Sequence, residues 1–335
     1  MKISINIQLN EKFFSGGVNF TRSLVDYLLR ENCEVIHHLN DDDIDIIFIL
    51  NVSGIYTYNF YDAKIYQLLN PSCCIVHRVN DSGLHRNGNL MKTLMKNCIK
   101  LSNYRIYISE WLKEFYEDKK NKTNSDVIYN GGNKTIFNSI NNTLWDGKER
   151  LKIVTHHWSN NYKKGHKFYK KLDDMLNSKV FSKKFSFTYI GNLPSNVKFN
   201  NTKIIQPIKG LELSSELQKH HVYITASVNE AAGMHHIEGA LCGLPILYLD
   251  SGALKEYCGD FGVSFNNHTF KKSLYKIRSD YFYYKKELKF YRFNSDYTSK
   301  KYLDRFQKLS SMKPLQINIE NFIFIKIQYF KLLSF

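Results

Sequence analysis

The stretch from Ser227 to Pro245 contains the residues best suited to chemistry. Two carboxylates, Glu230 and Glu238, stand there with seven residues between them, and Gly233 lies between the two. The glycine predicts the start of a helix, and a Gly-x-Pro sequence at the far end predicts its stop. Glu230 would then lie in the loop before the helix and Glu238 just over one turn inside it, so that both carboxylates can face one ligand.

The start of this predicted helix also offers backbone donors. The first amides of a helix have no partner inside it, and the helix terminus carries a partial positive charge. Amides on Gly233, Met234 and His235 therefore suit a phosphate. Carboxylates are natural acceptors for the hydroxyls of ribose and other sugars. The pattern predicts a ligand in which hydroxyls lie beside a phosphate.

Strands alternate with helices on both sides of a polar segment at 138–150. Apolar runs predict strands at 1–9, 34–37, 46–50, 73–77, 104–109 and 126–129, and then at 151–155, 185–190, 203–206, 221–225 and 244–249. Most of these runs barely alternate, which indicates strands covered on both faces, as in parallel α/β sheets. We predict a Rossmann-like domain at 1–145, a second at 146–295, and a helix at 296–335 that returns to the first domain and ends in an apolar tail.

The predicted fold class is therefore α/β, with two Rossmann-like, doubly wound domains that face a central cleft. Ligands usually bind at the carboxyl ends of the strands in such sheets. The helix that begins near Gly233 lies in the second domain and follows the predicted strand at 221–225.

The carboxylate pair, its helix and the Cys-Gly-x-Pro turn resemble the donor site of GT-B glycosyltransferases, specifically of the retaining family 4. Further segments resemble that family in the same order and spacing, from residue 15 to about residue 262: 15–18, 130–137, 162–165, 250–256 and 259–262. The resemblance implies a fold of two domains, an acceptor-side domain followed by a nucleotide-sugar domain. It also implies an enzyme of class EC 2.4 that transfers a sugar from a UDP- or GDP-sugar to a hydroxyl with retention of configuration.

Roles for the second domain follow from this resemblance. Glu238 would bind the ribose hydroxyls, Glu230 the hydroxyls of the donor sugar, and Lys164 the departing diphosphate. The amides around Gly233, Met234 and His235 would lie beside the sugar and the diphosphate. Glu230, Lys164 and a histidine of the first domain, His77, would then be the catalytic residues.

The sequence departs from the family at the second cation of the phosphate site. The family pairs its lysine with an arginine at the end of the preceding strand, and 155–160 contains none. Either His157 or a neighbour replaces this arginine, or Lys163 supplies part of the positive charge. Gly16 and Gly17 resemble the family's N-terminal glycine loop. These two glycines could contact a phosphate or the acceptor, or they could simply form the turn between a strand and a helix.

In the first domain, a predicted strand ends in His77, Arg78 and Asp81. The resemblance places His77 near the anomeric centre, where it could donate a hydrogen bond or orient an acceptor hydroxyl. A structural histidine is the alternative. Arg78 could bind an anionic acceptor, or it could form a salt bridge with Asp81; we take both as candidate acceptor-binding residues.

The amino-acid composition limits which partners and which cellular location we expect. The 47 Lys and Arg residues outnumber the 31 Asp and Glu residues, which gives a net charge of +16 and favours anionic partners. No apolar run is long enough for a membrane span, and the N-terminus lacks a signal peptide, so we expect a cytoplasmic protein. The six cysteines lack metal-ligand spacing and are predicted to be buried thiols.

The expected partners are a nucleotide sugar and a glycan or glycolipid acceptor, without nucleic acid, a required metal or another cofactor. Asp41–Asp45 is interpreted as a solvated loop rather than a metal site. The aromatic and basic stretch at 281–293 is interpreted first as packing helices, with a membrane surface and nucleic-acid stacking as alternatives. Peripheral contact with a membrane also stays open for the apolar tail at 315–335. The alternative functions are a nucleotide-sugar epimerase and a basic nucleic-acid-binding protein.

Overall fold

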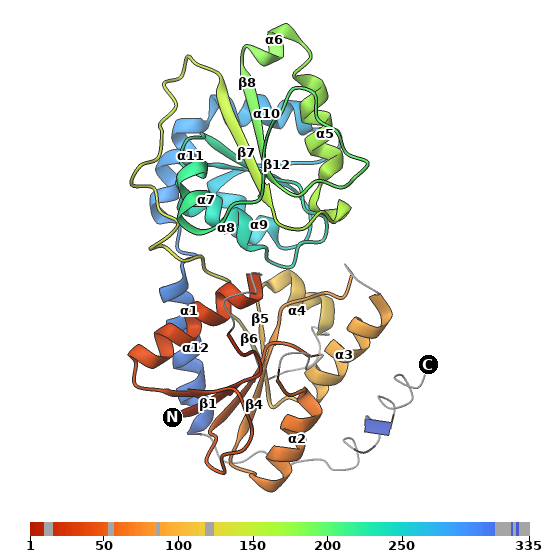
Figure 1. The fold of residues 1–335 in the computed structure, drawn as a ribbon, viewed down its shortest axis with the longest axis vertical. Helices are drawn as coiled ribbons and strands as arrows, with labels where there is room; N and C mark the ends of the chain where they lie inside the picture. Colours follow the sequence, from red (N-terminus) through yellow and green to blue (C-terminus); the bar gives the residue numbers. More distant parts are fainter. Residues whose placement is uncertain are drawn as a thin grey trace. The chain divides into compact units, whose positions relative to one another are not determined.

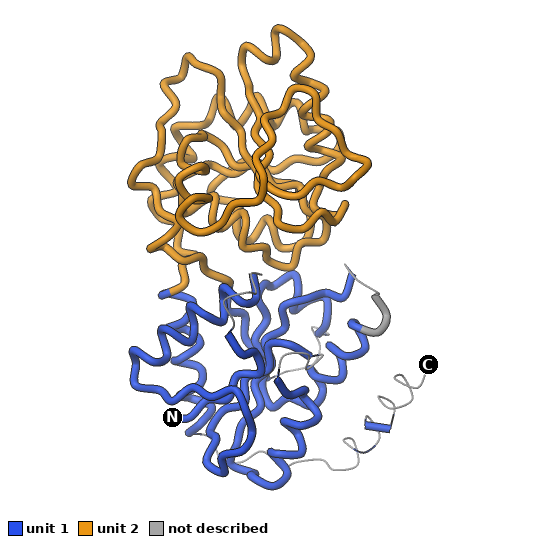
Figure 2. The backbone as a smooth tube through the Cα atoms, in the orientation of Figure 1, with its two compact units in different colours: residues 1–129, 296–335 blue, residues 130–295 orange. Residues whose placement is uncertain are grey.

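The computed structural model describes residues 1–9, 16–52, 57–84, 88–117 and 124–311, together with Ile323, Lys326 and Ile327. The chain divides into two compact units (Figure 2). Unit 1 contains residues 1–129 and 296–335, and unit 2 contains residues 130–295. The chain passes from unit 1 to unit 2 after residue 129, earlier than the boundary at residue 145 that we expected. Asn130 is hydrogen-bonded within unit 2, because its amide donates to the Tyr257 hydroxyl and its side chain donates to the Ala232 carbonyl.

Unit 1 is built on a six-stranded parallel sheet of order β2-β1-β3-β4-β5-β6 (Figure 1). Its elements are β1 (Lys2–Ile5), α1 (Gly16–Arg30), β2 (Glu34–Ile36), β3 (Ile46–Ile49), α2 (Phe60–Leu69), β4 (Cys74–Val79), α3 (Gly88–Leu101), β5 (Tyr104–Tyr107), α4 (Glu110–Tyr116), β6 (Ser125–Val127) and, from the far end of the chain, α12 (Ser295–Ser310). The central strands are buried on both faces, which agrees with their unbroken apolar runs.

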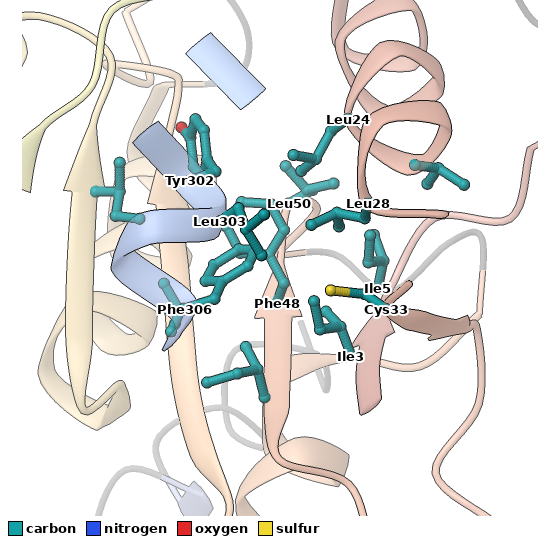
Figure 3. Close-up of a cluster of buried hydrophobic side chains, with 14 of the residues drawn as sticks. Ile3, Ile5, Leu24, Leu28, Cys33, Phe48, Leu50, Tyr302, Leu303 and Phe306 are labelled. Carbon is teal, nitrogen blue, oxygen red and sulfur yellow. The ribbon is translucent and has the colours of Figure 1, made fainter. Parts of the chain in front are cut away.

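Helix α12 completes the core of unit 1 (Figure 3). Tyr302 and Phe306 pack against Phe48 of β3 with ring centroids 5.4 and 5.0 Å apart, and Tyr302 also contacts Phe20 of α1 at 5.3 Å. Such aromatic pairs contribute about 0.5–1.5 kcal/mol each beyond the burial of their surface. The C-terminal helix is therefore a structural part of the unit formed by the first 129 residues.

Unit 2 repeats the architecture with the sheet order β12-β11-β10-β7-β8-β9, again parallel throughout. Its elements are β7 (Leu151–His157), η1 (Tyr162–Lys164), α5 (His166–Met175), α6 (Lys179–Ser182), β8 (Phe185–Gly191), β9 (Lys203–Ile205), α7 (Gly210–Leu217), β10 (Val222–Thr225), α8 (Met234–Leu241), β11 (Ile246–Leu249), α9 (Leu254–Cys258), η2 (Gly259–Phe261), β12 (Gly262–Phe265), α10 (Phe270–Ser279), α11 (Tyr281–Glu287) and η3 (Leu288–Phe290).

The α/β class and the doubly wound arrangement are confirmed in both units. The edge strand β12, which begins at Gly262, was not expected, and a side chain at Gly262 would collide with the backbone of Ile246. One local expectation was wrong. His77 lies inside β4 rather than at its end, because the strand continues to Val79 in register with β5.

All six cysteines are buried and unpaired, as predicted. Within the described ranges, no helix has the length and apolar character that crossing a bilayer requires. The apolar tail at 315–335 lies almost entirely outside the described residues.

Candidate functional site

The predicted donor residues gather at the carboxyl ends of β7 and β10 in unit 2. Strand β7 is flanked by β8 on one side and β10 on the other, so the winding of the sheet reverses between β7 and β10. Ligands of doubly wound sheets bind at such a reversal, outside the carboxyl ends of the strands. His156 and His157 end β7, and the loop with Glu230 follows β10 and leads into α8.

Glu238 in α8 is paired with His156. The imidazole Nε2 lies 2.8 Å from Glu238 Oε2, and both side chains are only about one-tenth exposed. The Tyr223 hydroxyl lies 3.1 Å from His156 Nδ1, and burial raises the Tyr223 pKa well above its usual range, so this phenol keeps its proton. We assign that proton to the bond with Nδ1, which leaves Nε2–H to donate to Glu238. The carboxylate is thus oriented by a chain of two hydrogen bonds that starts at Tyr223.

Glu230 is paired with Lys164. Lys164 Nζ donates to Glu230 Oε2 over 2.8 Å, and the side chains retain 27% and 10% of their exposure. Lys164 ends the short helix η1, and Gly165 follows with φ +96°, where a Cβ would lie 2.4 Å from the Ala226 carbonyl oxygen. Only glycine tolerates both the positive φ and this approach, which seats the lysine against the loop after β10.

The loop that carries Glu230 is held by its neighbours. The Val228 amide donates to the Lys163 carbonyl at 2.8 Å, and the Ala253 amide donates to the Glu230 carbonyl at 2.8 Å. Gly252 has φ +62°, and a Cβ there would lie 2.4 Å from the Glu230 carbonyl oxygen. The backbone of Glu230 is therefore fixed between the loops after β7 and β11, as a positioned functional group requires.

Helix α8 begins at Met234, one residue after the expected glycine, and no side chain caps it. Gly233 lies so close to its neighbours that a Cβ would contact the His235 ring at 2.5 Å and the Glu230 carboxyl carbon at 3.1 Å. The absent side chain lets that carboxylate approach the positive end of the helix, where amides suit an anion.

Two histidines near this edge, His157 and His235, are neutral hydrogen-bonding groups. His157 Nε2 lies 2.7 Å from the Tyr169 hydroxyl, and His235 Nε2 lies 2.8 Å from Thr225 Oγ1. Burial, reinforced by nearby cations, lowers the pKa of both imidazoles well below the usual range. His157 therefore does not act as the second cation that the motif resemblance implies. Lys163, which is exposed beside Lys164, remains the proposed second cation.

Sequence reasoning missed His156 and Tyr223 and chose the neighbouring His157. Successive residues of a strand point to opposite sides, and of the 156–157 pair it is His156 that bonds Glu238, whereas His157 bonds the Tyr169 hydroxyl. The residue identities alone do not tell which one. The adjacent histidines were nevertheless a usable signal, since they follow a predicted strand of the donor domain directly.

In unit 1, His77 is fully buried in β4 and neither ring nitrogen has a hydrogen-bond partner. Burial, with Arg105 and Arg78 nearby, lowers the His77 pKa to about 3, so the imidazole is neutral. The guanidinium of Arg78 lies 3.8 Å from the centre of the Phe20 ring. These two candidates thus belong to the interior of unit 1 as described.

Asp81 is better placed to meet a ligand. It lines a pocket of unit 1 with Asn51, Asn80 and the apolar side chains of Met91 and Met95. This pocket lies beyond the ends of β1, β3 and β4, at the reversal of the first sheet. The mixture of amide, carboxylate and apolar groups suits a sugar or another polar molecule with an apolar face.

Gly16 and Gly17 form the start of α1, where the Gly17 carbonyl accepts a bond from Thr21 Oγ1. This observation leaves both earlier alternatives, a ligand contact and a simple turn, in place. Among the described residues there is no group of three or more His, Cys, Asp or Glu side chains that could hold a metal ion.

Solved structures share this arrangement over nearly the whole chain. Sucrose-phosphate synthase from Thermosynechococcus elongatus is 12% identical, with a TM-score of 0.65 over 92% of this chain and 98% of its own. HepE from Anabaena, solved with UDP-glucose, is 10% identical, with a TM-score of 0.66 over 92% and 100%. The lipopolysaccharide outer core galactosyltransferase WaaB is 12% identical, with a TM-score of 0.68 over the same shares.

The chain has the GT-B fold. The resemblance inferred from the motifs is confirmed at this level, since the matching structures are glycosyltransferases of that fold. At identities of 10–12%, the likeness concerns the fold. No protein-family model matches the sequence, and no curated protein matches it either.

Proposed function

We propose that this GT-B protein is a glycosyltransferase that moves a sugar from a nucleoside-diphosphate sugar to an acceptor hydroxyl. The observation that carries the proposal is the pair of carboxylate contacts, Glu238 with His156 and Glu230 with Lys164, at the reversal of the unit 2 sheet. Glu238 and Glu230 were chosen for their spacing and for the motif resemblance of the stretch around them, and each has a nearly buried carboxylate with a positioned donor.

Each group has a chemical task in this proposal. Glu238, oriented by His156, accepts hydrogen bonds from the ribose, and Glu230 accepts them from the donor sugar. Lys164 and the first amides of α8 stabilise the negative charge that develops on the departing diphosphate. Because Lys164 is bound to Glu230 in this structure, we expect the diphosphate to compete for the ammonium group when the donor binds.

We also propose the stereochemistry, the donor nucleotide and the acceptor. Retention of configuration follows from the motif resemblance to family 4. UDP-sugars are the first donors to test, because HepE was solved with UDP-glucose and a further match, an alpha-glucosyltransferase of 15% identity, was solved with UDP. The acceptor is proposed to be a glycan or glycolipid hydroxyl, with Asp81 and its pocket as the candidate binding site.

The proposal is tested by a thermal-shift panel of UDP-, GDP- and ADP-sugars with the full chain. Ligands that bind only the folded state raise the melting temperature. At a ligand concentration of about a hundred times Kd, the free energy of unfolding rises by about 2.7 kcal/mol. We expect one nucleotide family to stabilise the protein, and NMR of the glycoside formed from that donor to show the donor's anomeric configuration. Absence of stabilisation by every nucleotide sugar would contradict the proposal, whereas donor turnover without an acceptor would favour an epimerase.

A further inference from the structure

One face of unit 2 combines exposed apolar side chains with unpaired basic ones. Helix α11 and the adjoining turn η3 bury Tyr281 but expose three aromatic rings: Phe282 at 58%, Tyr283 at 60% and Phe290 at 71%. Sequence interpretation favoured packing for the stretch at 281–293. Tyr291 and Phe293 also pack, against Phe261 and Tyr257, whereas the three exposed rings do not follow this interpretation. Large exposed apolar groups in one place usually mark an interaction site.

A second segment extends the same face. The polypeptide at 139–148 packs on α11, because the Trp145 ring stacks with Phe282 at 6.0 Å and the Lys285 ammonium bonds to Asn142. Helix α11 is labelled in Figure 1. This segment exposes Ile140 at 83% and Leu144 at 62%. We call the five exposed apolar residues and the basic groups beside them the α11 face: Ile140, Leu144, Phe282, Tyr283, Phe290, Lys286, Lys289 and Arg292.

The charge of the α11 face is positive. Residues 281–292 contain four cations, Lys285, Lys286, Lys289 and Arg292, against one carboxylate, Glu287, so the net charge is +3 (4 − 1). Within the described residues, Lys286, Lys289 and Arg292 have no ion-pair partner and are exposed. Interleaved aromatic and basic side chains match a membrane interface, because the rings enter the boundary of headgroups and acyl chains while the cations meet lipid phosphates.

We propose that the α11 face docks unit 2 on an anionic phospholipid surface as a peripheral contact. Charge complementarity selects this occupant over a neutral surface, since three unpaired cations lie in the same segment as the exposed rings. The proposal concerns an interaction surface and is independent of the proposed transferase activity. It assigns part of the overall charge of +16 to a specific place on the molecule.

Cosedimentation of the full chain with vesicles tests this proposal. Vesicles of phosphatidylcholine with about one-third phosphatidylglycerol are compared with vesicles of phosphatidylcholine alone, at low and at high salt. We expect binding to the anionic vesicles only, weakened by salt. Equal binding to both kinds of vesicle, or no binding to either, would overturn the proposal.

Two variants and their matched controls locate the contact. Lys286→Glu with Lys289→Glu should weaken binding by at least about thirtyfold, at ~1 kcal/mol per lysine near an anionic surface. Lys179→Glu with Lys198→Glu changes the net charge equally at exposed positions elsewhere and should have a much smaller effect. Equal losses in the two double variants would overturn the assignment to α11.

The apolar contribution is tested with Phe282→Ser and Phe290→Ser combined, against Val180→Ser and Leu211→Ser at positions that are similarly exposed. We expect only the first pair to lose vesicle binding, while both double variants remain folded in thermal unfolding. Sedimentation velocity without lipid tests whether a second copy of the chain binds the α11 face instead. A dimer of the wild-type chain that Phe282→Ser with Phe290→Ser dissociates, together with no lipid binding, would show a contact between copies and overturn the proposal.

Discussion

The ion pair of Lys164 with Glu230 gives the most detailed prediction. Replacing the lysine in Lys164→Met removes an ammonium group 2.8 Å from a carboxylate that is only 10% exposed. Exposed pairs contribute about 0.2–1 kcal/mol, and breaking a fully buried pair costs about 3–5 kcal/mol. Lys164 itself is 27% exposed, so solvent screens part of the interaction. We therefore expect the free energy of unfolding to fall by about 1–2 kcal/mol in urea titrations.

A double-mutant cycle isolates the pair. Glu230→Gln keeps an oxygen that can accept from the ammonium group and removes the negative charge, so its cost should be smaller than that of Lys164→Met. The coupling energy from both single variants and the double variant should be about 1 kcal/mol. Lys167→Met, at an exposed position one turn away, serves as the control and should change stability by less than about 0.5 kcal/mol.

Catalysis should respond far more strongly than stability. If Lys164 meets the developing charge of the diphosphate, Lys164→Met lowers kcat by about 10²–10³ while most of the protein remains folded. Lys167→Met should retain the wild-type rate. Unchanged turnover in the folded Lys164→Met variant would refute the role of the lysine. A stability loss above about 4 kcal/mol would show that the pair is mainly structural.

Two further predictions concern the fold around the site. Gly252→Ala should destabilise the protein by about 1–3 kcal/mol and impair donor binding, because φ at this position is +62° and the new Cβ would collide with the backbone of Glu230. The control is Gly210→Ala, where φ is +58° but nothing lies within 4 Å of the new Cβ. Equal effects of the two variants in thermal unfolding and in donor titration would refute the argument. The free energy of unfolding should also fall as the pH is lowered. Burial lowers the pKa of His77 to about 3 and that of His236 to about 4, so below about pH 6.5 the unfolded chain binds protons that the folded chain excludes. Each histidine then lowers the free energy of unfolding by up to about 1.4 kcal/mol per pH unit. Urea unfolding at about pH 7 and about pH 5 measures this loss, and a His236→Leu variant with an undiminished pH dependence would contradict it.

Much of the fold could be predicted because apolar runs determine which strands are buried. The runs at 46–50 and 151–155 correspond to β3 and β7, and the glycine that was expected to begin a helix is followed by α8. Edge strand β12 was missed because glycine and polar residues precede it, and an edge strand needs less apolar surface than a central one.

The site was predictable where the pattern lay within one local element. Glu230 and Glu238 belong to one loop and helix, so their spacing within the surrounding motif was enough to select them as candidates. Lys164 followed from the motif resemblance. The partners His156 and Tyr223 come from two different strands, and only the folded sheet brings them to the same carboxylate. The orientation of His77 depends likewise on how far β4 extends, which the residues of the strand do not reveal by themselves.

The central claim is that Glu238, oriented by His156, binds the ribose of a nucleotide sugar. Calorimetric titration of the stabilising nucleotide sugar into the wild-type chain and into Glu238→Gln tests it most directly, with Glu212→Gln at an exposed position of α7 as the control. Loss of charged hydrogen bonds worth about 1.5–3 kcal/mol each should raise Kd at least about thirtyfold in Glu238→Gln. The control should bind like the wild type. A Glu238→Gln variant that binds the nucleotide sugar with wild-type affinity would contradict the account.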